Sequence, residues 1–533
     1  MQRLHSHVIT TSDAFRENRA HNLKLAEQLR QRLNDARFKR PQRAFDLLAE
    51  RKKLTVRARL ELLLDPGTPF LELSPLAACE AYDGTAPQGL IVTGIGVING
   101  RELVVTAGDS TIKGGSWYPL TIKKLIRAMD IALESNLPMV HLIDSGGAYL
   151  PLQDEIYAMG GAVYYNQCRM SALGIQQIAL VLGPCTAGGA YLPTLCDISI
   201  IVRNTGFVFL AGPPLVKAAT GQEVSADELG GAEMQTAVSG VADYAVANEQ
   251  EGLALVRELV GTWRRTPKAD TDRRTPEAPY YDPQDLYGIV PRDTKRQFDM
   301  REVIARIVDG SRFTEFKPNY GETLVTGWAF ILGMKVGILG NNGVLFTEAA
   351  NKATQFMQLC DRDGIPLLFL HNVTGFMVGI EYERGGITKS GARMLMVQAN
   401  VTVPKFSVFV NASQGAGNYA MTGRAWRPRF LFTWPNSRSA IMGPEQAVTT
   451  LTEVRVASIR RERGRDPTPE EIESIVANVG EYFERTSGPY HLTSELRDDG
   501  LIDMIDTRNA LGMALSASLN APIVRAPGGI LRI

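Results

Sequence analysis

The sequence contains an internal repeat, which restricts its possible folds more than any other feature. Three motifs of the first half return in the second: Val92-Thr93-Gly94 as Val325-Thr326-Gly327, 233 positions later; LPMVHLIDSGGAYLP around Asp144 as IPLLFLHNVTGFMVG around Asn372, 228 positions later; and CTAGGAY around Gly189 as SQGAGNY around Gly417, again 228 positions later. Because two of the three motifs keep the same offset, the sequence predicts one structural unit built twice.

Each copy alternates short β-branched runs, such as MVHLID and LLFLHN, with stretches of helical period. This alternation is typical of strand-helix units and predicts the α/β class. The string TGIGVING (93–100) resembles a dinucleotide-binding turn, but the strand-like RELVV follows it where that motif requires a helix. We therefore expect a β-hairpin turn there.

A chain of 533 residues is longer than one hydrophobic core usually supports, so we expect two main domains. Leucines at helical spacing predict a helical amino-terminal arm, and a stretch rich in charge, proline and threonine (262–283) predicts a linker. The predicted parts are the arm (1–60), a first domain (61–265), the linker (266–285) and a second domain (286–533).

Composition excludes several classes of function. The 57 basic and 57 acidic residues balance, so a nucleic-acid partner is not expected. Neither an apolar leader nor an 18-residue apolar window is present, so we expect a cytoplasmic protein without a membrane partner. Five cysteines without a CxxC pair favour a reducing compartment and buried thiols.

The motifs of common catalytic sites are absent as well. Six histidines without HExxH or zinc-ligand spacing predict no metal, and GxSxG is missing. His141 and His371 lie within apolar runs, so we interpret them as core residues.

The repeated glycine-rich motif is the strongest candidate for chemistry. Glycine has no Cβ, so the amides of Gly188 and Gly189 can approach a ligand oxygen closely, as in an oxyanion hole. Ala416 and Gly417 occupy the equivalent positions of the second copy. Two such holes would suit a reaction between two carbonyl-bearing partners. The alternative is a tight turn kept by duplication alone.

Basic residues around a predicted helix after Pro119 form a weaker candidate. Lys113, Lys123, Lys124 and Arg127 would either contact phosphates or cover a solvated helix face. The segment 211–233, with its Pro-Pro and Gly-Gly pairs, is expected to shape a pocket wall.

Long strings in both halves resemble one known family. They are DSGGAYLPLQDE, YNQCRMSALGI, GPCTAGGAYLPTLCD, FLAGPPLVKAATGQEVS, NNGVLFTEAANKATQF, FMVG, GAGNYAMTGRAWRPRFLFTWPN and DDGLID. The chain resembles the carboxyltransferase (β) subunits of biotin-dependent acyl-CoA carboxylases from about residue 15 to 530. FMVG and GAGNYAM are similar to the branch acting on 3-methylcrotonyl-CoA and geranyl-CoA.

The resemblance implies two tandem crotonase-like (ClpP/crotonase) domains. It implies an acyl-CoA on the first, with the hole at Gly188 and Gly189, and carboxybiotin on the second, with the hole at Ala416 and Gly417. Further residues match by position: Ser145, Gly146, Gly147, Ala148, Tyr149, Gly160 and Lys113 on the substrate side, and Phe376, Val378, Asn418, Tyr419 and Ala420 on the biotin side.

The resemblance also implies partners. Carboxybiotin would come from a biotin carboxylase/biotin carrier subunit, because this chain lacks a biotinyl-lysine motif. A homo-oligomer with a hexameric core is implied, with each active site formed between two protomers. The biotin ureido group would take the proton from the acyl-CoA, so no side-chain base is required.

Departures from the family pattern concern the substrate. After QDE this chain is about three residues shorter, Gly160 stands where relatives have a phenylalanine, and Tyr149 replaces an asparagine. A longer acyl chain would fit the space left by the missing aromatic ring, unless Tyr149 fills that space instead. The alternatives are a propionyl-, acetyl- or longer acyl-CoA carboxylase subunit, a crotonase-type hydratase or isomerase, a biotin-dependent decarboxylase subunit, and a non-catalytic scaffold for a biotin-carrier subunit.

Overall fold

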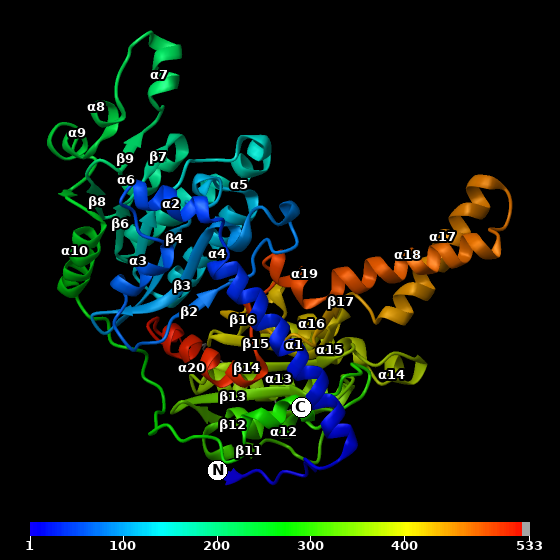
Figure 1. Cartoon of the computed structure of the whole chain (residues 1–533). Helices are drawn as coiled ribbons and strands as arrows, with labels where there is room; N and C mark the ends of the chain where they lie inside the picture. The colour runs from blue at the N-terminus through cyan, green and yellow to red at the C-terminus, as the bar shows by residue number, and fades with distance from the viewer. Residues whose placement is uncertain (525–533) are drawn as a thin grey trace.

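The computed structural model describes residues 1–524 and shows two lobes, each built on its own sheet (Figure 1). The first sheet has seven strands in the order β10-β8-β6-β5-β4-β3-β2. Their bounds are β2 Leu71–Leu73, β3 Ile91–Ile98, β4 Arg101–Gly108, β5 Met139–Ile143, β6 Gln177–Val181, β8 Ile198–Val202 and β10 Tyr244–Val246. The strands from β4 to β10 run parallel, whereas β3 is antiparallel to both of its neighbours, β2 and β4.

The second sheet repeats this plan. Its nine strands follow the order β1-β11-β12-β13-β14-β15-β16-β18, with β17 beside β15. Their bounds are β1 Gln2–Arg3, β11 Arg312–Glu315, β12 Leu324–Ile331, β13 Met334–Asn341, β14 Leu367–Val373, β15 Lys405–Gln414, β16 Phe430–Thr433, β17 Arg438–Ala440 and β18 Gly500–Leu501. Again an antiparallel hairpin, here β12–β13, leads into parallel strands.

Helices cover both sheets. In the first lobe they are α3 Val56–Leu63, α4 Pro119–Ser135, α5 Gln153–Ala172, α7 Pro213–Thr220, α8 Ala226–Gly230, α9 Ala232–Ala237 and α10 Glu249–Thr262. In the second they are α11 Leu286–Ile289, α12 Met300–Ile307, α13 Thr347–Arg362, α14 Ile380–Arg384, α15 Ile387–Asn400, α17 Pro444–Arg463, α18 Pro469–Ser487, α19 Pro489–Ser494 and α20 Thr507–Ser518.

The repeat extends to individual hydrogen bonds. In the first lobe the Trp117 N–H donates to the Gly147 carbonyl, and in the second the Leu345 N–H donates to the Gly375 carbonyl. Both partners are displaced by the same 228 positions that separate the motifs. The predicted α/β class, the duplication and the hairpin at 99–100 are therefore confirmed.

The amino-terminal arm consists of two helices and a short strand. Helix α1 (Asp13–Phe38) begins at Ser12, whose hydroxyl caps the Phe15 N–H, and α2 spans Gln42–Glu50. Helix α1 crosses both lobes (Figure 1), and its buried Asn22 donates to backbone carbonyls of Tyr287 and Val290 in the second lobe. Before it, β1 pairs with β11. The arm therefore holds the two lobes together, which helical periodicity alone did not predict.

Buried ion pairs connect the lobes directly. Arg127 on α4 binds the fully buried Asp499 at 2.7 Å, and Arg429 binds Glu134 at 3.2 Å. Lys124 is also buried and donates to the carbonyls of Gln88 and Ile91. Both expectations for Lys124 and Arg127 were therefore wrong: neither residue contacts phosphate or lies on a solvated face, because each satisfies internal acceptors.

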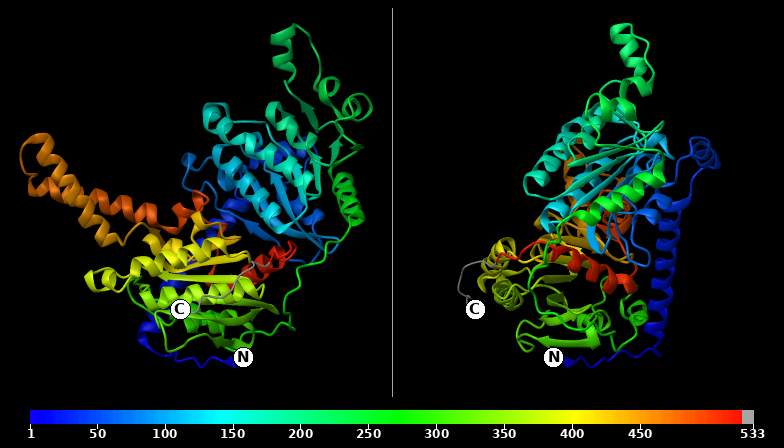
Figure 2. Two further views of the ribbon diagram at one scale, coloured as in Figure 1. Left: turned by 180° about the vertical axis from the view of Figure 1, so that it is seen from behind. Right: turned by 90° about the vertical axis from the view of Figure 1, so that its left-hand side faces the viewer.

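Residues 263–282 form an irregular segment that runs along one side of both lobes, where the linker was predicted (Figure 2). Residues 525–533 of the predicted second domain lie outside the described residues.

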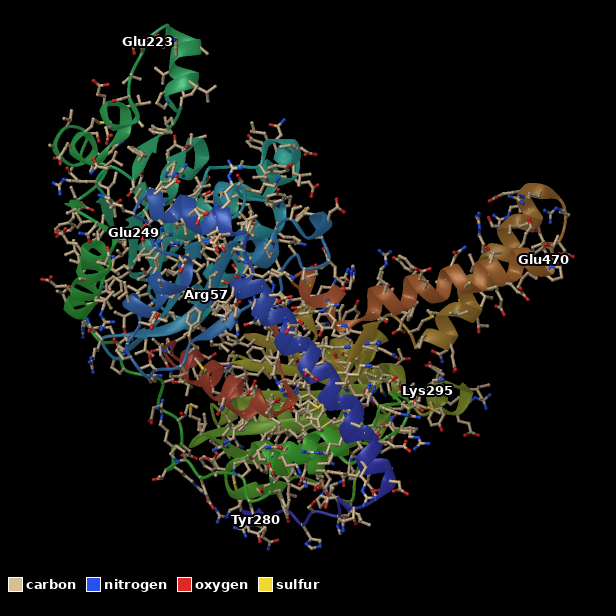
Figure 3. All side chains as sticks on the ribbon, viewed as in Figure 1. Arg57, Glu223, Glu249, Tyr280, Lys295 and Glu470 are labelled. Carbon is tan, nitrogen blue, oxygen red and sulfur yellow. The ribbon has the colours of Figure 1, made fainter. Side chains whose placement is uncertain are left out.

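Two segments extend from the body. Helix α7 and the loop to Glu223 form the outer end of the first lobe, and α17 and α18 form a long hairpin that carries Glu470 (Figure 3). The segment 211–233, expected to form a pocket wall, thus belongs to a projection. In the described part of the chain no helix is long and apolar enough to cross a membrane. Cys168 is exposed, so the expectation of buried thiols was wrong for that residue.

Candidate active site

The first glycine turn follows a short strand at the end of the parallel sheet. Strand β7 (Pro184–Thr186) pairs with β9 (Phe207–Phe209), and the chain then enters the 3-10 helix η5 (Ala187–Ala190) and helix α6 (Tyr191–Thr194). The first amides of a helical turn have no carbonyl partner within it. A 3-10 helix that begins at Ala187 forms its first bond between the Gly189 N–H and the Thr186 carbonyl, so the Gly188 N–H has no partner within the helix. The Gly188 N–H is therefore the donor that this turn leaves over, and the Gly189 N–H lies next to it.

Tyr164 on α5 holds this turn in place. Its hydroxyl donates to the Gly188 carbonyl at 2.6 Å. That carbonyl and the Gly189 N–H belong to one planar trans peptide unit, so fixing the oxygen also fixes the opposite direction of the N–H. A hydrogen bond to the carbonyl also polarises the peptide and strengthens its N–H as a donor. The motif search missed Tyr164, because no spacing rule connects it to the turn.

The two glycines differ in the space around them. A Cβ on Gly188 would lie 2.7 Å from the Tyr164 hydroxyl, whereas a Cβ on Gly189 would meet no heavy atom within 4 Å. The space beside Gly189 is therefore open, as a ligand oxygen would need.

The second glycine turn repeats the arrangement in the other lobe. Strand β15 ends at Gln414, and α16 (Gly415–Ala420) follows it directly. The amides of Ala416 and Gly417 lie in the first turn of α16, so neither has a carbonyl partner one turn earlier in that helix. Ala416 is exposed and Gly417 is buried against Gly375, the same order of exposure as at Gly188 and Gly189. In one chain the two turns belong to different lobes (Figure 1).

The predicted substrate-side loop lies against the segment that carries Lys113. The Ser145 hydroxyl is buried, donates to the Gly115 carbonyl at 2.7 Å and accepts from the Gly147 N–H at 3.2 Å. Ser145 therefore shapes the loop. Lys113, together with the loop residues Gly146 and Ala148, is exposed and accessible to a ligand.

Tyr149 and Gly160 determine the space left for an acyl group. The Tyr149 ring stacks on Tyr118, with centroids 4.4 Å apart and planes 11° apart. Gly160 lies within helix α5, and a Cβ there would meet no atom within 4 Å. The segment predicted to be a shortened loop is therefore helical and leaves open space at Gly160.

A buried ion cluster anchors the loop. The Asp144 carboxylate, at the end of β5, binds Lys53 at 2.6 Å, Arg59 at 3.0 Å and the Ser110 hydroxyl at 2.8 Å, and Arg59 also binds Glu249 at 2.6 Å. Burial lowers the pKa of Lys53, and the charge of Asp144 opposes that shift. Sequence analysis placed Asp144 in a repeated motif but missed its partners, because they come from α3, α10 and the arm.

The predicted biotin-side residues differ in accessibility. Val378 and Tyr419 are exposed, at 75% and 47%, and Phe376 is half-buried. The Asn418 amide donates to the Ser413 hydroxyl at 2.8 Å. Ala420 is fully buried in the core, so its side chain cannot contact a ligand, and only its backbone remains available for the role assigned to it.

The two core histidines are unsuited to acid or base catalysis. Burial lowers the pKa of His141 to about 4 and that of His371 to about 3, so both are neutral near pH 7. Each ring bonds one hydroxyl, His141 to Thr106 and His371 to Ser413. Across residues 1–524 no group of three or more His, Cys, Asp or Glu side chains is placed to hold a metal ion.

The carboxyl transferase domain family matches residues 49–527. The chain belongs to this family. This carboxyltransferase is 47% identical over 513 residues to the biotin-dependent 3-methylcrotonyl-coenzyme A carboxylase β1 subunit of Mycobacterium tuberculosis, covering 96% of this chain and 97% of that one. It is 48% identical to the mitochondrial methylcrotonoyl-CoA carboxylase β chain of Arabidopsis thaliana, covering 99% and 91% of the two chains.

A solved structure gives the same result for the whole fold. The β subunit of Pseudomonas aeruginosa geranyl-CoA carboxylase superimposes with a TM-score of 0.89 at 40% identity, and the match covers 100% of both chains. The resemblance to carboxyltransferase β subunits of the methylcrotonyl-CoA and geranyl-CoA branch is thereby confirmed.

Proposed function

We propose that this carboxyltransferase transfers CO2 from carboxybiotin to a branched enoyl-CoA, with one partner held at each glycine turn. The observation that carries this proposal is the helix-opening turn at Gly188–Gly189, with open space beside Gly189, and its repeat at Ala416–Gly417. The first turn would hold the acyl thioester oxygen as it gains enolate charge, and the second the ureido carbonyl of biotin. Carboxybiotin supplies the CO2 and the acceptor for the substrate's proton.

The chain's own contribution is positioning and charge stabilisation. Donors fixed in advance need no reorganisation as the oxyanion forms, and each one removed costs about 10²–10³ in kcat. Tyr164 fixes the Gly189 donor, and Asp144 with its cations fixes the adjacent loop. The two core histidines are neutral, which is compatible with a mechanism that uses no side-chain base.

We further infer an active site assembled from two protomers, which the position of the two turns of one chain in different lobes supports. Exposed apolar side chains beside the turns, Tyr157 and Tyr165 on α5 and Val378 and Ile380 near α14, support association with a second copy. The hexameric core, the biotin-bearing partner subunit and a cytoplasmic location remain predictions from the sequence.

Within the proposed substrate class, the open space at Gly160 favours a long acyl chain such as geranyl. Tyr149 is stacked on Tyr118 and is therefore not free to refill that space. The test is kcat/KM for 3-methylcrotonyl-CoA and geranyl-CoA, measured with the biotin-bearing partner, for the wild type and for Gly160→Phe.

We expect Gly160→Phe to lower kcat/KM for geranyl-CoA at least tenfold while changing that for 3-methylcrotonyl-CoA much less. Gly160→Ala is the matched control and should leave the ratio unchanged. Equal effects on both substrates would contradict the acyl assignment, and inactivity of the wild type with every acyl-CoA would contradict the function itself.

A further inference from the structure

A cavity lies at the opposite end of the first sheet from the glycine turn. It is lined by the β3–β4 turn with Gly100 and Arg101, by the chain before β5 and β6, by residues 264–268 of the linker and by Asn520 after α20. Strands β5 and β6 begin at this end, and the turn with Gly188 follows their other end. Strand β6, whose five residues at about 3.3 Å each give a length of about 16 Å, lies between the two sites.

Three arginines border this cavity without a carboxylate partner. They are Arg101, which is half-buried, and the exposed Arg264 and Arg265. Among residues 1–524, none of the three guanidinium groups has a carboxylate oxygen within 4.0 Å, although the chain forms many ion pairs elsewhere. A cavity with three uncompensated cations has a positive potential, which low-dielectric walls concentrate.

The nearest carboxylates are already engaged. Glu102 accepts from Lys268 at 2.6 Å and from the amide of Asn520 at 2.7 Å. Asp65 accepts from Arg257 at 2.8 Å and from the Gly100 N–H at 2.8 Å. Neither acid is therefore available to neutralise the arginines.

The guanidinium groups of Arg101 and Arg265 both lie close to the β3–β4 turn. Arg101 donates to the Arg264 carbonyl at 2.8 Å, which fixes it against the linker. Arg265 approaches the β3–β4 turn, where a Cβ on Gly100 would lie 3.6 Å from its Nη2 atom. Burial, together with the neighbouring charge of Arg265, lowers the pKa of Arg101, as expected for like charges without an anion between them.

We infer that this cavity binds a small phosphate-bearing anion of the size of diphosphate, at a site separate from carboxyl transfer. Arginine forks match phosphate oxygens with two parallel hydrogen bonds, which explains the choice of three arginines over lysines. The cavity volume of about 280 Å³ lies below the range of about 300–1,000 Å³ for pockets that enclose drug-sized molecules, so a compact anion fits better than a whole nucleotide.

Binding there would join the linker to the first lobe. Arg101 belongs to β4, Arg264 and Arg265 to the linker, and Asn520 to the end of the second lobe. An anion that contacts these groups together stabilises the folded chain by mass action and should raise its melting temperature.

The test is calorimetric titration of the full chain with inorganic diphosphate in about 150 mM NaCl, where unspecific attraction is screened. We expect saturable binding that weakens at least tenfold in the double variant Arg101→Gln/Arg265→Gln. The control Arg16→Gln/Arg362→Gln removes the same charge from exposed helix positions and should bind as the wild type does. If the double variant fails to fold, the exposed Arg264→Gln replaces it.

A parallel titration with ADP identifies the source of the phosphate. Weaker binding of ADP than of diphosphate assigns the site to an inorganic anion, whereas tighter binding assigns it to a nucleotide whose base extends from the cavity. Absence of saturable binding by both, or undiminished binding in the arginine variant, would overturn the inference. Because no carboxylation is measured, this result is independent of the proposed function.

Discussion

The substitution Gly189→Val tests the first oxyanion assignment most directly. The added Cβ would meet no heavy atom within 4 Å, and Gly189 does not have the left-handed backbone that favours glycine. The folded chain can therefore accept valine, at an intrinsic cost below about 1 kcal/mol for a β-branched residue in a helical turn. The valine methyl groups would occupy the open space beside Gly189, where the thioester oxygen is expected.

Loss of one oxyanion-hole donor lowers kcat by about 10²–10³, which corresponds to about 3–4 kcal/mol of transition-state stabilisation. The assay is single-turnover carboxylation with the biotin-bearing partner, accompanied by melting temperature and sedimentation to verify folding and assembly. Gly480→Val on α18 is the control, because its Cβ would touch only a Val448 methyl at 4.0 Å. A folded, assembled Gly189→Val protein that retains more than about a tenth of wild-type kcat would refute the assignment.

Three further predictions concern the groups that support the site and the lobes. Tyr164→Phe removes the donor to the Gly188 carbonyl. The lost hydrogen bond contributes about 0.5–1.5 kcal/mol, so we expect kcat to fall about 2–12-fold while KM changes little. An unaltered kcat would show that the hydroxyl does not position the turn. Arg59→Met leaves Asp144 buried with one cation fewer, so the free energy of unfolding measured in denaturant should fall by about 3–5 kcal/mol. A loss below about 1 kcal/mol would contradict the stabilising role of the buried ion cluster. Burial raises the pKa of Asp498 to about 6, so the folded state loses stability as the pH rises from about 4 through about 6. Over that range the free energy of unfolding of Asp498→Asn should rise by about 3 kcal/mol relative to that of the wild type. A difference between the two proteins that does not change with pH would be inconsistent with that pKa.

The repeat made the core of each lobe predictable. The motifs that recur at a fixed offset became matching strands, turns and hydrogen bonds, because each repeated unit folds through contacts between residues near one another in sequence. Both glycine turns were located for the same reason, since in either copy a strand that ends in small residues leads directly into a helix.

Contacts between distant segments were not predictable. Lys124 and Arg127 have helical spacing and charge typical of a surface, yet their partners are backbone carbonyls and Asp499, brought in by other elements. Tyr164 likewise gains its role only when α5 packs beside the turn. Sequence pattern reports which face of a helix is apolar, and it says little about which polar group from another segment will meet a buried charge.

The pairing of β1 with β11 has a consequence for synthesis on the ribosome. Arg3 pairs with Arg312, so β1 remains without its partner until more than 300 further residues have been made. At about 5–20 residues per second this wait lasts about 15–60 s. Throughout that interval the amides of β1 bond water, and the strand joins its sheet only after most of the chain has been synthesised.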